Sequence, residues 1–224
     1  MPSSLMHIYL IEAGPRLLAG MSEESSAHAE QFLREMGVNI LLNKRVVDYR
    51  DHKVVLEDGT EIATRTFIWV SGVTGVTIGN LDASLIGRGG RIKVDSFNRV
   101  EGMNNVFAIG DQCIQLADEN YPNGHPQLAQ VAIQQGELLA KNLIRMEKGQ
   151  EMKPFHYRNL GSMATVGRNR AVAEFSKVKM QGWFAWVMWL VVHLRSILGV
   201  RNKVIVLLNW IWNYFTYDQS MRMI

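Results

Sequence analysis

The apolar residues of the first seventy positions fall into short runs between polar and turn residues, which predicts strands around one helix. The predicted strands are His7–Ile11, Val38–Leu42, Val46–Tyr49, Val54–Leu56, Glu61–Ile62 and Phe67–Val70. A helix is predicted from about Ser22 to Met36, because Ser22 can cap it, two glutamates follow, and Gly37 suits its end. This order of elements predicts an α/β domain.

The middle of the chain carries a second strand-and-helix pattern. Strands are predicted at Ile92–Val94 and at Val106–Ile109, a buried run that ends at Gly110-Asp111. In open α/β sheets, ligands bind just beyond the carboxyl ends of the strands. Apolar residues at helical spacing then predict a helix from near Pro126 to about Gly149. Its N-terminus would suit an anion or an electron-rich carbonyl.

The last seventy residues differ in character from the rest. Short strands joined by glycine-rich turns are predicted after Phe155, and two apolar segments follow at Trp183–Leu194 and Val204–Phe215. Neither segment reaches the roughly 20 residues that a membrane span needs. Basic residues interrupt them, namely Arg195, Arg201 and Lys203. We therefore expect helices that lie in a membrane interface, with two helices packed as a soluble core as the alternative.

The charge and composition of the chain limit the kinds of partner that it can bind. The net charge is +3, but residues 153–224 contain ten Lys and Arg against two acidic residues, with five of the six tryptophans. Such a region can bind nucleic acid or an anionic membrane, and the long apolar runs favour the membrane. The single cysteine, Cys113, excludes an internal disulfide and a cysteine-cluster metal site, and we interpret it as a buried apolar residue.

Several stretches resemble one family of flavoproteins. FAIGD (107–111) followed by AQVAIQQG (129–136) resembles the second flavin-contacting segment of flavoproteins with two dinucleotide-binding domains. The AQxAxxQ form, LIEAGPRLL (10–18), GSMATVGRNRAVA (161–173) and the C-terminal tail resemble bacterial type II NADH:quinone oxidoreductases. The resemblance extends from His7 to the end of the chain.

The resemblance implies an α/β fold with parts of two dinucleotide-binding (Rossmann-like) domains and a C-terminal amphipathic helical membrane-anchoring region. The implied boundaries are 1–75 for the second half of an NAD(H)-binding domain, 76–152 for a segment of the FAD-binding domain, and 153–224 for the membrane-associating region. An acidic residue at the end of a strand in such a domain bonds a ribose hydroxyl of NAD, and Glu12 has this position. It also favours NADH over NADPH, because it would repel a 2′-phosphate.

The resemblance also implies the cofactors and the residues that contact them. The expected FAD contacts are Gly110, Asp111, Ala129, Gln130 and Val131, and the expected NADH contacts are Glu12 and Gly72. Gln130 and Gln134 are expected on the side of a membrane quinone, because a carboxamide can donate to a quinone carbonyl. The implied activity is NADH:quinone oxidoreduction without proton pumping, at the cytoplasmic face of a bacterial inner membrane, and the resemblance allows a homodimer.

One expected motif does not occur in the sequence. A phosphate-binding G-x-G-x-x-G turn should lie roughly 20 residues before Glu12. We therefore expect this chain to be the C-terminal half of a longer flavoprotein, and to bind FAD poorly and react little with NADH on its own. The alternatives are a silent membrane-binding module, a disulfide reductase, or a sulfide:quinone reductase, although the catalytic cysteine of the last has no counterpart here.

Overall fold

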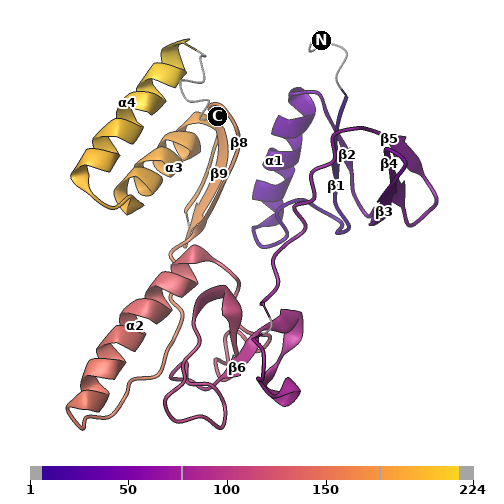
Figure 1. The fold of residues 1–224 in the computed structure, drawn as a ribbon. Helices are drawn as coiled ribbons and strands as arrows, with labels where there is room; N and C mark the ends of the chain where they lie inside the picture. Colours follow the sequence, from indigo (N-terminus) through magenta and orange to yellow (C-terminus); the bar gives the residue numbers. More distant parts are fainter. Residues whose placement is uncertain (1–6, 77, 177, 217–224) are drawn as a thin grey trace. The chain divides into compact units, whose positions relative to one another are not determined.

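The computed structural model describes residues 7–76, 78–176 and 178–216, which form two compact units (Figure 1). One unit contains the residues up to 67 together with those from 161 onward, and the other contains residues 68–160. Both units mix helices and strands, so the predicted α/β class is confirmed.

The first unit begins with the strand–helix–strand arrangement that the sequence predicts. Strands β1 (Ile8–Ile11) and β2 (Val38–Leu41) pair in parallel, with Ile8 opposite Val38, and helix α1 (Glu23–Glu35) connects them. Ser22 caps α1 and its hydroxyl oxygen accepts a hydrogen bond from Ser25 N, as its position predicted.

An antiparallel meander follows, made of β3 (Val46–Arg50), β4 (Lys53–Leu56) and β5 (Glu61–Ala63). Val54 and Leu56 of β4 are buried. The predicted strand Phe67–Val70 is wrong: these residues are irregular, and Val70 is 84% exposed. The run is apolar enough for a buried strand, but it does not join the parallel sheet, which contains β1 and β2 among the described residues.

The first unit is completed by three strands and two helices from the end of the chain. Strands β8 (Ser162–Gly167), β9 (Arg170–Phe175) and β10 (Val178–Gln181) form an antiparallel sheet in the order β10-β9-β8. Helix α3 (Gly182–Ser196) packs on it, where Ala171, Ala173 and Ala185 form a fully buried core of small side chains. Helix α4 (Val200–Thr216) follows. Among the described residues, every helix is too short or too polar to cross a membrane.

Charged residues of the sheet and of its β8–β9 turn bind the ends of helices. The Glu174 carboxylate on β9 accepts hydrogen bonds from the main-chain N and the hydroxyl of Ser22, at the N-terminus of α1. Arg170 donates to Phe32 O near the other end of α1, and Arg168 donates to Tyr214 O near the end of α4. A carboxylate at a helix N-terminus and cations near C-termini complement the helix dipole. These contacts join segments that are far apart in sequence.

The second unit is built around a two-stranded parallel sheet and a long helix. Strands β6 (Ile92–Val94) and β7 (Cys113–Gln115) pair with Ile92 opposite Cys113, and α2 (Ala129–Glu147) follows them. Short 3₁₀ turns occur at Ala83–Leu85 (η2), Arg88–Gly90 (η3) and Gly110–Gln112 (η4). A core of four buried residues lies on this sheet: Ile92, Val94, Val100 and Cys113.

The predicted strand Val106–Ile109 is wrong, because the strand of this region, β7, begins at Cys113, four residues after the run ends. Residues 106–109 instead pair locally with residues 98–100, where Val100 N donates to Val106 O (2.8 Å) and Ala108 N donates to Asn98 O (3.0 Å). Val106 is 47% exposed, whereas all three residues of β7 are buried. The parallel partner of β6 is therefore the segment after Gly110-Asp111, and these two residues lie in the turn that enters β7.

Candidate functional site

The turn at Gly110 is closed against helix α2. Gly110 has φ +66°, a left-handed conformation, and a Cβ on it would lie 3.2 Å from the Cβ of Ala132. Its main-chain N–H donates to Oε1 of Gln135 at 2.7 Å. Glycine is thus required here both by the backbone conformation and by the closeness of the helix.

Asp111 lies beside the start of the same helix. Its carboxylate is exposed, and its main-chain oxygen accepts a hydrogen bond from Nε2 of Gln127 at 3.1 Å. Gln127 comes immediately before Leu128, the N-cap residue of α2. The turn and the helix N-terminus, both predicted as flavin contacts, are therefore neighbours within one unit.

Helix α2 begins at Ala129, three residues later than the sequence suggested, and no side chain caps it. Leu128 has an extended backbone, and Leu128 O accepts the N–H of Val131 at 2.9 Å. Val131 is only 3% exposed and packs against Phe155 and Tyr157, so its side chain belongs to the core. Main-chain N–H groups at an uncapped helix start are well suited to an electron-rich group.

The side chains of Gln130 and Gln134 bind the main chain of residues 158–160. Gln134 exchanges two hydrogen bonds with Arg158, donating to its O (2.9 Å) and accepting from its N (3.0 Å). Oε1 of Gln130 accepts the N–H of Leu160 at 3.1 Å. Residues four apart lie on the same face of a helix, so together they hold an extended segment along α2. Sequence reasoning could not find partners 24 and 30 residues away.

Sequence reasoning missed the role of Gln135. Its side chain is 1% exposed and holds Gly110, and it also contacts the sulfur of Cys113 at 3.6 Å. The available signal was its spacing, because a polar residue four positions after Val131 lies on the buried face of the helix. Burial raises the pKa of the Cys113 thiol, which keeps it protonated and agrees with the interpretation of Cys113 as a core residue.

Glu12 lies at the end of β1, as predicted, in the first unit. Its Oε1 accepts the N–H of Gly14 at 2.7 Å, and its main chain bonds to Leu41 and Lys44. Among the described residues, its Oε2 has no hydrogen-bond partner. Gly72 belongs to the second unit and has φ +99°. The described part of the chain also has no group of three His, Cys, Asp or Glu that could hold a metal ion.

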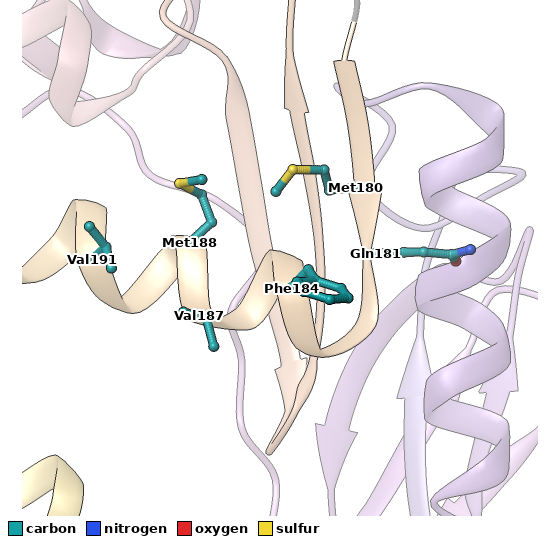
Figure 2. Close-up of a pocket in the computed structure, with 6 residues that line it drawn as sticks. All are labelled: Met180, Gln181, Phe184, Val187, Met188 and Val191. Carbon is teal, nitrogen blue, oxygen red and sulfur yellow. The ribbon is translucent and has the colours of Figure 1, made fainter.

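Helices α3 and α4 expose an unusual amount of apolar surface. A groove of about 530 Å³ lies between β10 and α3 (Figure 2), and it is lined by Met180, Gln181, Phe184, Val187, Met188 and Val191. Phe184 is 73% exposed, and α4 exposes Trp212 (56%) and Phe215 (76%). Exposed apolar patches of this kind mark surfaces that bind proteins, membranes or apolar ligands.

The structure shows an α/β chain in which a glycine turn lies beside an uncapped helix start, and comparison with known proteins gives its family. Residues 3–136 match the pyridine nucleotide-disulphide oxidoreductase family, and residues 159–217 match the NDH2 C-terminal domain. The chain belongs to the pyridine nucleotide-disulphide oxidoreductase family, among its type II NADH:quinone oxidoreductases. The resemblance that the sequence motifs indicated is thereby confirmed.

One curated relative supports this family, and two solved structures share the fold. The chain is 35% identical over 216 residues to the type II NADH:quinone oxidoreductase NdhA of Mycobacterium tuberculosis (strain ATCC 25618 / H37Rv), an alignment that covers 91% of this chain and 44% of that protein. The structure of NDH2 from Plasmodium falciparum in complex with NADH has a TM-score of 0.83 at 19% identity, covering 94% of this chain and 58% of that one. The sulfide:quinone oxidoreductase of Aquifex aeolicus has a TM-score of 0.67 at 15% identity, covering 94% and 54%. The chain thus spans less than half the length of the curated relative.

Proposed function

We propose that this chain acts in an NADH:quinone oxidoreductase, in which bound FAD accepts a hydride from NADH and passes two electrons to a membrane quinone. The proposal rests on one observation: the N-terminus of α2 is uncapped and lies beside the Gly110–Asp111 turn. Family membership supports the reaction class, and the geometry supports a flavin at this turn.

The residues at the turn suit a flavin. Gly110 lets the turn lie against the start of α2, and the exposed carboxylate of Asp111 can accept a hydrogen bond from a ribityl hydroxyl. The first turn of α2, formed by Ala129, Gln130 and Val131, presents the positive end of the helix dipole, which stabilises negative charge on the ring. These residues would orient the cofactor and tune its charge.

Glu12 and Gly72 are the proposed NADH contacts. Because Oε1 of Glu12 is engaged by Gly14, Oε2 is the oxygen that would accept a ribose hydroxyl. The same carboxylate would repel a 2′-phosphate, so we expect NADH to be preferred over NADPH. We propose that the nucleotide is bound from the cytoplasmic side of a bacterial inner membrane, where NADH is available. A homodimer stays a prediction.

Gln130 and Gln134 are proposed to lie on the quinone side. A carboxamide N–H can stabilise the charge that develops on a quinone oxygen during reduction. Both side chains also hold residues 158–160, so they would link the quinone site to this segment. In a FAD-containing enzyme that includes this chain, Gln130→Ala should slow quinone reduction more than flavin reduction by NADH. Equal losses in the two half-reactions, measured by stopped-flow absorbance, would rule out this role.

The flavin site can be tested on the chain itself. We expect added FAD to show weak, saturable quenching of its fluorescence with the wild-type chain, and the quenching to be lost in Gly110→Val. Valine is strained at φ +66° and would fill the space next to Ala132. Gly37→Val is the control, because Gly37 also has a positive φ but nothing within 4 Å of its Cβ position. Equal quenching by both variants would contradict the proposed site.

Helices α3 and α4 are proposed to bind the membrane surface. Their exposed apolar residues are flanked by Arg195, Arg201 and Lys203, which can approach anionic headgroups. Replacing all three with Gln should weaken binding to vesicles containing phosphatidylglycerol by about a hundredfold, at ~1 kcal/mol for each charge. A control variant carries the same changes at the C-terminal end of α2 and its cap, at Lys141, Arg145 and Lys148. A similar loss of vesicle binding in the control variant would mean that the net charge of the chain alone attracts it to the vesicles.

A further inference from the structure

A buried histidine–aspartate pair lies in the loop before α2. Nε2 of His125 and Oδ2 of Asp118 are 2.9 Å apart, and the two side chains are only 2% and 3% exposed. Charged groups are rarely buried this deeply unless they are paired and hydrogen-bonded. Neither residue has a role in the site as described so far.

Aromatic side chains surround the ring of His125. Tyr121, Phe155 and Tyr157 pack around it, with ring centroids 5.1, 5.2 and 5.9 Å from the imidazole. Its Nδ1 is buried and has no hydrogen-bond partner among the described residues. A carboxylate oxygen accepts hydrogen bonds, so the Nε2–H of His125 donates to Asp118.

Hydrogen bonds extend from this pair to both sides of the flavin site. Oδ1 of Asp118 accepts the N–H of Asn120 at 3.0 Å, which shapes the loop. The main-chain oxygen of His125 accepts from Nη2 of Arg91 at 3.1 Å, and Nε of Arg91 donates to Cys113 O at 2.6 Å. Cys113 follows the Gly110–Gln112 turn directly, and His125 lies three residues before the N-cap of α2.

We propose that His125 and Asp118 are positioning residues, whose buried hydrogen bond holds the N-terminus of α2 against the Gly110–Asp111 turn. The inference deepens the proposed function, since it assigns to the pair the geometry of the flavin site. Without the bond, the loop loses its buried anchor while the body of α2 keeps its own packing. The helix start would then sample positions away from the turn.

Hydrogen–deuterium exchange of the 224-residue chain tests the proposal, read peptide by peptide. His125→Phe keeps the aromatic packing and removes the bond. It should raise exchange in peptides covering residues 127–131 by roughly tenfold or more, as expected for a lost hydrogen bond to a buried charge. Exchange in α1 and β9, which belong to the other unit, should not change. The matched control is His156→Phe, because His156 is exposed between the buried Phe155 and Tyr157.

A conservative variant distinguishes a role in positioning the start of α2 from a role in the overall stability of the fold. His125→Gln can still donate to Asp118, so exchange at 127–131 should return close to the wild-type rate. If His125→Phe fails to fold, Asp118→Asn provides the test, with a smaller local rise because the amide oxygen still accepts. Unchanged exchange at 127–131, an equal rise in α1, or no rescue by Gln would each overturn the proposal. A chain that never quenches FAD fluorescence would count against the proposed function only, since the exchange pattern does not depend on flavin.

Discussion

Replacing Gln135 with methionine should destabilise the second unit, because one buried hydrogen bond connects α2 to the Gly110 turn. The Gln135 side chain is 1% exposed, and its Oε1 accepts the Gly110 N–H at 2.7 Å. Methionine has a similar volume and shape, so the change removes the acceptor without creating a large cavity. Leaving a partly buried N–H without a partner costs about 1–3 kcal/mol.

The expected loss of folding free energy is large enough to measure by urea denaturation. With a urea dependence of about 2 kcal/mol/M, a loss of about 2 kcal/mol lowers the unfolding midpoint of the second unit by about 1 M. Far-UV circular dichroism gives the overall transition, and hydrogen exchange in α2 peptides isolates the unit that contains the substitution. The control is Gln31→Met in α1, because Gln31 bonds Glu35 at the exposed surface. A midpoint shift no larger than that of the control would refute the assignment of Gln135 as a structural link.

Two further substitutions test other parts of the structure. The hydrogen bond from His125 holds the pKa of Asp118 below its ordinary value, so the pair stabilises the fold above the usual aspartate pKa and loses this contribution as the pH falls through the lowered pKa. Asp118→Asn should therefore flatten the acid limb of a plot of thermal stability against pH, and an unchanged limb would contradict this. Gly161→Ala would place a Cβ 2.4 Å from Glu174 O at φ +109°, and we expect a loss of about 2–4 kcal/mol from overpacking and backbone strain. Gly37→Ala, where no atom lies within 4 Å, measures the strain alone, and equal losses in urea denaturation would show that no clash exists.

The elements that the sequence predicted correctly have strong local signals. Helix α1 has a capping serine, acidic residues in its first turn and glycine after its end, and the structure confirms each signal. The parallel pair β1 and β2 and the meander of β3 to β5 also follow from short apolar runs between turns. The two C-terminal apolar segments form helices as expected, because their length and spacing exclude strands.

The two wrong strands show what local patterns cannot decide. Phe67–Val70 and Val106–Ile109 are both apolar runs of strand length, but a strand exists only where a neighbour pairs with it. Val106–Ile109 makes only an isolated bridge, between Phe107 and Arg99, whereas β6 pairs with Cys113–Gln115. Cys113–Gln115 lacks the apolar signal of a buried strand because it includes the polar Gln115, which is 1% exposed in the structure.

The glutamines of the α2 region bind different backbone segments, depending on the face of the helix from which each side chain projects. Gln134 faces residues 158–160, whereas Gln135, turned by one residue, faces Gly110. Gln127, before the helix, holds Asp111 through its main chain. Each of these amides already binds a backbone group and so fixes a segment around the helix start. The groups best placed to act on a flavin are therefore the main-chain N–H groups of the first turn, whereas these three side chains hold the neighbouring segments against the helix.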